Sequence, residues 1–207
     1  GALVLPLNSA NFRDSRPTVA ATHFFFHQDL CFTLGPSLED LVWLFGADAL
    51  QQSTRTLAAT TGQRFDRSGV YTLRSHESWM FTHAESYTDR PAHADALLVD
   101  LWWRGQNMCF DPGTYLYYGH QPWLDAFKHT RFHNTVVVDG KDQMERAYRF
   151  TWGYWHNARI LHWQQEEDVQ ILEAEHDGYE RLDDPVLHRR AIVAVDDHWL
   201  IIDDIIA

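Results

Sequence analysis

From residue 68 onward the chain consists of short apolar or alternating runs separated by polar turns, and this pattern constrains the fold more than any other feature. Alternation with a period of two is typical of strands, because successive side chains point to opposite faces of a sheet. Strands are expected at residues 69–74, 79–83, 96–103, 107–110, 134–138, 159–163, 169–174, 187–195 and 198–206. So many short strands predict a mostly β chain, with a large antiparallel β-sandwich over residues 68–207.

The first 67 residues have a different pattern. A helix is expected at residues 36–45, because Ser37 can cap it, Glu39 and Asp40 fall in its first turn, and its apolar residues share one face. Residues 18–26 can also form a helix, although their aromatic and β-branched side chains disfavour it. Residues 51–67 are polar and resemble a connection between domains. We therefore expect a short helical part before the sandwich.

Three chemically suggestive residues stand at the ends of strand-like runs: His93, Asp111 and His133. Their spacings of 18 and 22 residues are too long for a local zinc finger, so they can meet only through a folded sheet. Two imidazoles and a carboxylate suit zinc, with one coordination position left over. The alternative is that they are three unrelated polar residues.

Composition narrows the classes of partner. The net charge is −12 with 17 basic residues, which argues against nucleic acid because phosphate binding needs a basic surface. No run reaches the length of a membrane span, so no membrane partner is expected. The two cysteines, Cys31 and Cys109, allow at most one bridge. Because residues 199–207 end within a strand-like run, we expect a fragment of a longer protein.

Several motifs, in order, resemble the C-terminal region of heparinase II/III-like polysaccharide lyases. They are His93-Ala-Asp-Ala-Leu, Asp111-Pro-Gly-Thr-Tyr, His133-Asn-Thr-Val-Val-Val-Asp-Gly and Trp199-Leu-Ile-Ile-Asp-Asp. The resemblance covers roughly residues 68–207. It implies that residues 1–67 are the C-terminal end of an α/α toroid with a linker. The activity implied is β-elimination of a uronate-containing, alginate- or glycosaminoglycan-like polysaccharide in a cleft between toroid and sandwich.

The resemblance also implies roles for particular residues. His93, Asp111 and His133 match zinc ligands of the metal-containing members. Tyr115 matches a cleft tyrosine and is a candidate catalytic residue, with Tyr117 and Tyr118 beside it. Substrate-binding candidates are Arg131, for the uronate carboxylate, and Tyr118. The partner is then an acidic polysaccharide or oligosaccharide, met in the periplasm or outside the cell, and the fragment alone is expected to be inactive.

One position departs from the family pattern. Many members carry His-x-His-x-Asp, whereas Pro91 replaces the first histidine here, which leaves the general base unassigned. Two alternatives therefore stay open: a carbohydrate-binding sandwich that has lost catalysis, and a hydrolase in which zinc activates water. Further along, residues 188–190 (His-Arg-Arg) are expected to place exposed cations on a strand.

Overall fold

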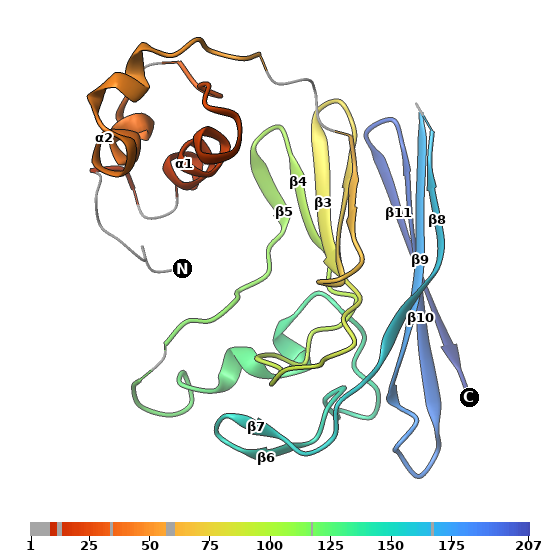
Figure 1. Cartoon of the computed structure of the whole chain (residues 1–207). Coiled ribbons are helices and arrows are strands. Elements are labelled where there is room, and N and C mark those ends of the chain that lie inside the picture. Colours follow the sequence, from red (N-terminus) through yellow and green to blue (C-terminus); the bar gives the residue numbers. More distant parts are fainter. Residues whose placement is uncertain (1–8, 12–13, 34, 57–60, 117, 167) are drawn as a thin grey trace. The chain divides into compact units, whose positions relative to one another are not determined.

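The computed structural model describes residues 9–11, 14–33, 35–56, 61–116, 118–166 and 168–207. The chain forms two compact units, Gly1–Ala59 and Thr60–Ala207 (Figure 1). The division therefore lies ahead of the boundary expected at residue 68. Of the described helices, none has the length and apolar character needed to cross a membrane.

The first unit is helical. Helix α1 (Arg16–His27) begins with Pro17 in its first turn, where a missing N–H costs nothing, and is followed by η1 (Pro36–Leu38), α2 (Glu39–Phe45) and η2 (Ala47–Gln51). The expected helix at residues 36–45 thus starts with a 3₁₀ turn. A small core lies beneath these helices, in which the rings of Phe24 and Phe45 pack 5.0 Å apart. The other two phenylalanines of the run, Phe25 and Phe26, are exposed.

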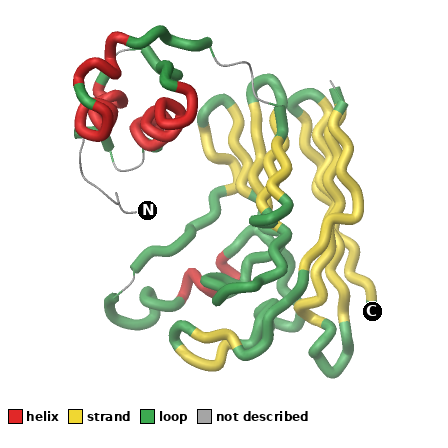
Figure 2. Tube along the Cα trace, in the orientation of Figure 1, coloured by secondary structure: helices red, strands yellow, loops and turns green. Residues whose placement is uncertain are grey.

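The second unit contains two antiparallel sheets that face each other (Figures 1 and 2). Five strands, in spatial order, form one sheet: β1 (Gln63–Phe65), β2 (Val70–Arg74), β3 (Ser78–His83), β4 (Asp100–Trp103) and β5 (Gln106–Cys109). Four form the other, in the order β11 (His198–Ile206), β10 (Val186–Val195), β9 (Val169–Tyr179) and β8 (Ala158–Gln165). A small hairpin, β6 (Arg146–Tyr148) and β7 (Thr151–Trp152), stands apart from both.

The core lies between the two large sheets. Strand β10 alternates buried and half-buried residues along almost its whole length, as the period-two pattern requires. Its Ile192 packs with Leu172 of β9 against Leu73 and Met80 of the opposite sheet. This interdigitation of two inner faces confirms the expected antiparallel sandwich.

The strand expected at residues 96–103 forms only in its second half, as β4, and the strand expected at residues 134–138 does not form. Residues 96–99 and 134–138 are irregular, apart from a single bridge between Val138 and Lys141. Leu97 has a φ of 58°, which interrupts an extended run and is uncommon for a branched residue. The apolar side chains of residues 96–99 are buried, whereas Val136 and Val138 are half-buried and Val137 is exposed. The pattern therefore correctly indicated burial over residues 96–99 but not the backbone conformation.

Candidate functional site

The candidate residues lie on three irregular segments that meet beside the five-stranded sheet. His93 precedes β4, Asp111 follows β5, and His133 follows the 3₁₀ helix η4 (Thr130–Phe132). Asn134 joins these segments. Its side-chain amide donates to the carbonyls of Val99 and Phe110, both at 3.0 Å, and its own carbonyl accepts from the Val99 N–H at 3.2 Å. The residue beside His133 therefore fixes the segments that carry the other candidates.

Two buried polar residues complete the connection. The Thr130 hydroxyl donates to the Ala94 carbonyl at 2.7 Å, and the Gln143 amide both accepts from the Ala96 N–H at 2.7 Å and donates to the Ala96 carbonyl at 3.0 Å. These side-chain hydrogen bonds take the place of the backbone hydrogen bonds of a sheet, because buried N–H and C=O groups need partners. Sequence reasoning missed Thr130 and Gln143, because an uncharged polar residue inside a loop carries no periodic signal.

The two imidazoles face each other, with ring centroids 5.2 Å apart. His133 holds a hydrogen bond of 2.7 Å between its Nδ1 and Oδ2 of Asp111. Its other nitrogen, Nε2, is buried and has no hydrogen-bond partner within the described part of the chain. His93 Nε2 lies 2.9 Å from the Thr114 hydroxyl. A buried imidazole nitrogen without a partner beside a second imidazole is an arrangement that a metal ion would satisfy.

Asp95 supplies the carboxylate that is grouped most closely with both histidines. His93, Asp95 and His133 can each offer one ligand atom, and these atoms all lie within 4.8 Å of one another. We expected Asp111 as a ligand and Asp95 as a residue that orients His93. In the structure Asp111 contacts His133 directly, and Asp95 lies between His93 and the buried His83, whose Nε2 is 3.4 Å from Asp95 Oδ1.

The ionisation of His93 and Asp95 suits a metal site. Burial lowers the pKa of His93, which favours the neutral imidazole that binds metals. Burial would raise the pKa of Asp95, but the neighbouring histidines His83, His133 and His93 hold it well below its usual range. For His133, burial acts to lower the pKa, yet the hydrogen bond to Asp111 and the charge of Asp95 raise it overall. The cluster therefore places the charged carboxylate of Asp95 beside His93, whose neutral imidazole is favoured, and His133, whose protonated imidazole is favoured.

A residue of the other sheet supports two of these segments. Arg190 on β10 is 5 % exposed and donates through Nη1 to the carbonyls of Leu97 at 2.5 Å and Asn134 at 2.8 Å. It also forms a two-pronged pair with Asp203 of β11, at 2.7 and 2.9 Å. The expectation of exposed cations at residues 188–190 is therefore wrong for Arg190 and for the buried His188. It holds better for Arg189, which pairs with Glu175 and is a third exposed.

The candidate substrate residues lie on the chain between Asp111 and His133. Tyr115 is 62 % exposed, with its ring edge-on to those of Phe127 and Trp123. Arg131 is exposed and lies over the ring of Phe132. Tyr118 is exposed beside the Arg149 guanidinium, and Tyr117 lies outside the described residues. The structure thus keeps these groups accessible without bringing them together at one point.

Sequence comparison with known proteins identifies the family of the chain. A family model described as heparinase II/III-like, C-terminal, matches residues 58–207. A heparin-sulfate lyase of Bacteroides stercoris is 32 % identical over 110 residues, which cover 51 % of this chain and 14 % of that protein.

Solved structures agree on the fold. A heparan sulfate lyase from Pedobacter heparinus aligns with a TM-score of 0.66 at 19 % identity, and a heparinase III with 0.69 at 18 %. Each alignment covers 97 % of this chain and 29 % of the other, so the chain spans less than a third of these relatives. With a family match over most of its residues, the chain belongs to the heparinase II/III-like family, through the C-terminal region of that family.

Proposed function

We propose that this chain is the sandwich part of a polysaccharide lyase that cleaves an acidic, heparan-type glycosaminoglycan by β-elimination. The observation that carries the proposal is the family match over residues 58–207, together with a curated relative named as a heparin-sulfate lyase. Because the chain covers only part of such relatives, the activity belongs to the longer protein. The relatives named above are heparin- or heparan-sulfate lyases or heparinases, which favours this substrate class over alginate, the other class that the resemblance suggests.

The chemistry defines what the site must supply. A base removes the proton at C5 of the uronate, the C4–O4 bond breaks, and a double bond forms between C4 and C5. The departing O4 takes up a proton, so no water is consumed. The C5 proton becomes acidic enough only when the carboxylate charge is neutralised, and a tyrosine or histidine can transfer the protons.

Within this chain, Tyr115 and Arg131 are the best candidates for contact with substrate. The hydroxyl of Tyr115 is on an exposed ring, which lets it reach O4 or C5 of a bound sugar. Arg131 can pair with the uronate carboxylate, since a guanidinium binds carboxylates in a fork. Tyr118, exposed on the same segment, would widen the contact. Other catalytic groups would come from outside this chain.

We also propose that zinc binds between His93 and His133, with a carboxylate from Asp111 or Asp95. Support comes from the buried, unpartnered Nε2 of His133 and from the close group that includes Asp95. The bound ion would add a fixed positive charge and cross-link the loops that border the cleft. Asp111 holds the His133 ring in place, while Asp95 is itself held by His83. We assign this metal a structural role.

The experiment uses the full-length protein with heparan sulfate and with alginate as substrates. Absorbance in the unsaturated-uronate band should rise with heparan sulfate, and the rate should fall strongly in Tyr115→Phe. New reducing ends without that absorbance would indicate hydrolysis and refute the elimination. Binding without any cleavage would support the non-catalytic alternative, which the proline at position 91 favours.

A further inference from the structure

Three cations surround a single aromatic ring near the candidate metal centre. Arg90, Lys128 and Arg149 lie over the ring of Phe150 at 5.5, 4.9 and 4.7 Å from its centroid. Like charges repel, so a folded chain gathers them only where something compensates for the repulsion. In a chain with a net charge of −12, such a concentration of positive charge is unexpected.

The carboxylates in this region compensate for only part of the charge of Arg90 and Lys128. Asp125 lies 3.3 Å from Lys128 but also 2.6 Å from Arg146, so one acid is shared by two cations. Arg90 donates to the Phe150 carbonyl at 3.0 Å, and no carboxylate of the described residues lies within ion-pair distance of it. Arg90 and Lys128 together therefore keep an excess of positive charge.

These cations line a small cavity. It measures about 70 Å³ and opens beside His93, with Arg90, Lys128, Arg149 and Thr114 supplying polar groups. Trp152 and Pro91 form apolar walls. A space of this size is larger than the roughly 10–15 Å³ that a single water molecule needs. It fits a single charged substituent.

The chemistry of the lining favours an anionic ligand. The positive charges of Arg90, Lys128 and Arg149 attract an anion, and an apolar group would leave these charged side chains without solvent or partners. Pro91 stands where many family members carry a histidine, and here it offers a wall without a hydrogen-bond donor. Recognition in this cavity would therefore fall to the guanidinium and ammonium groups, which bind oxyanions strongly.

We propose that this cavity binds one anionic substituent, a sulfo group or a carboxylate, of the acidic glycan, with Arg90 and Lys128 as its principal contacts. The identity of the glycan rests on the function proposed above. The anion site itself stands on the cation cluster and the cavity. It lies next to His93, so a sugar anchored here would lie along the loops that carry the candidate metal ligands.

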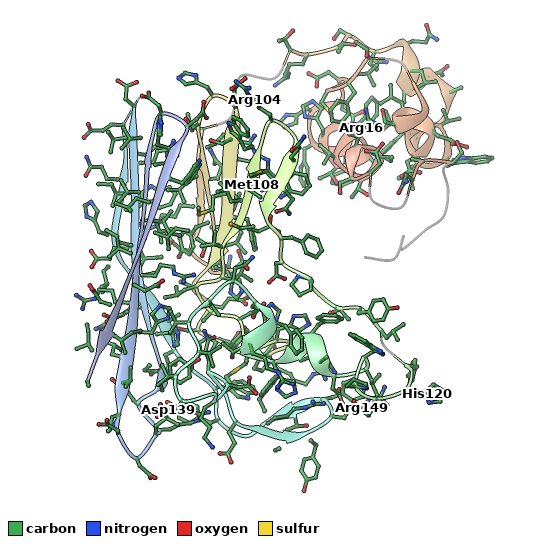
Figure 3. The ribbon with its side chains drawn as sticks, turned by 180° about the vertical axis from the view of Figure 1, so that it is seen from behind. Arg16, Arg104, Met108, His120, Asp139 and Arg149 are labelled. Carbon is green, nitrogen blue, oxygen red and sulfur yellow. The ribbon has the colours of Figure 1, made fainter. Side chains whose placement is uncertain are left out.

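The test compares Arg90→Gln with Arg104→Gln in the full-length protein. Arg104 is a matched control, because it also stacks on an aromatic ring, Trp103 at 4.6 Å, and loses the same charge. It lies at the β4–β5 turn, whereas Arg149 lies at the β6–β7 turn (Figure 3). Both variants are checked for folding by circular dichroism. Lys128→Gln is the second variant of the cluster.

Two probes are used. With heparan-derived tetrasaccharides, we expect Arg90→Gln to weaken binding by about tenfold or more and Arg104→Gln to leave it nearly unchanged. With inorganic sulfate replacing chloride at equal ionic strength, the parent protein and Arg104→Gln should gain thermal stability that Arg90→Gln and Lys128→Gln lose. Comparing N-sulfated with N-acetylated tetrasaccharides separates the two substituents. If Arg90→Gln weakens binding of the N-sulfated tetrasaccharide alone, the cavity binds the sulfo group. If it weakens binding of both tetrasaccharides equally, the cavity binds the carboxylate.

Equal behaviour of Arg90→Gln and Arg104→Gln with every probe overturns the anion site, even if the protein cleaves heparan sulfate. Conversely, selective loss of sulfate binding in a protein that cleaves no glycan upholds the anion site and refutes the proposed lyase activity.

Discussion

Replacing Arg190 with methionine should weaken the sandwich and loosen the loops of the candidate site. The change removes the two-pronged pair with Asp203 and both hydrogen bonds to the carbonyls of Leu97 and Asn134. Breaking one partner of a buried pair costs about 3–5 kcal/mol. Since the Asp203 side chain is 29 % exposed and water can reach it, we expect the lower end, about 3 kcal/mol.

Urea unfolding followed by tryptophan fluorescence measures this loss. Of the nine tryptophans only Trp43 precedes residue 60, so the signal reports mainly on the sandwich unit. With a slope of about 2 kcal/mol per molar urea, the midpoint should fall by about 1.5 M.

Arg189→Met is the control, because Arg189 neighbours Arg190 on the strand but points to the surface. In Arg189→Met, Glu175 still pairs with Arg159, so the free energy of unfolding should fall by less than about 1 kcal/mol. If Arg190→Met and Arg189→Met unfold at the same urea concentration, the inference that Arg190 braces the loops is wrong. Amide hydrogen exchange adds a local readout, since residues 95–99 and 130–136 should exchange faster in Arg190→Met alone.

Three further predictions concern the metal, the catalyst and acid stability. His133→Ala should abolish stoichiometric zinc binding, measured by titration against a zinc indicator. Asp95→Asn and Asp111→Asn show which carboxylate is a zinc ligand and which one only supports a ligand. Loss of a ligand should abolish zinc binding, whereas loss of a supporting carboxylate should weaken it about 10–100-fold. Unchanged zinc affinity in all three variants refutes the zinc site. Tyr115→Phe should lower kcat by about 10²–10⁴ with little change in KM, and an unchanged kcat excludes this hydroxyl from proton transfer. Burial lowers the pKa of His156 from 6.5 to about 4, so between these pH values the unfolded chain binds a proton that the folded chain excludes, and the free energy of unfolding falls as the pH drops from 6.5 to 4. His156→Phe should remove roughly 3 kcal/mol of that fall, measured by urea unfolding at successive pH values. Parallel plots of stability against pH for the parent and the variant would contradict this.

The sequence predicts the sandwich well where strands are long. Strands β10 and β11 are nine or more residues long, and their start and end agree with the expected ranges to within one residue. The first half of the strand predicted at residues 96–103, residues 96–99, does not form. A segment that is buried on all sides has the same continuous apolar sequence whether it is a strand or an irregular segment, so the pattern cannot distinguish the two. The positive φ of Leu97 and the bonds from Gln143 decide between them, and neither is visible in the local pattern.

The candidate site was partly predictable for the same kind of reason. His93, Asp111 and His133 could be selected because their chemistry and spacing are unusual, and the structure brings the two histidines face to face with Asp111 against one of them. The position of Asp95 and the support from Arg190 depend on how the far sheet packs, which no spacing in the sequence reports. Arg189 and Arg190 look alike in the sequence, and only the alternation of β10 assigns them to opposite faces.

The amide of Asn134 makes the site vulnerable to chemical ageing. Its nitrogen donates to two carbonyl oxygens at once, so deamidation to aspartate would place a negative oxygen against both of them. Two attractions would become two repulsions, at a point where three loops are joined. A stored preparation that slowly gains one negative charge at this residue should therefore lose its loop order while its sheets remain intact.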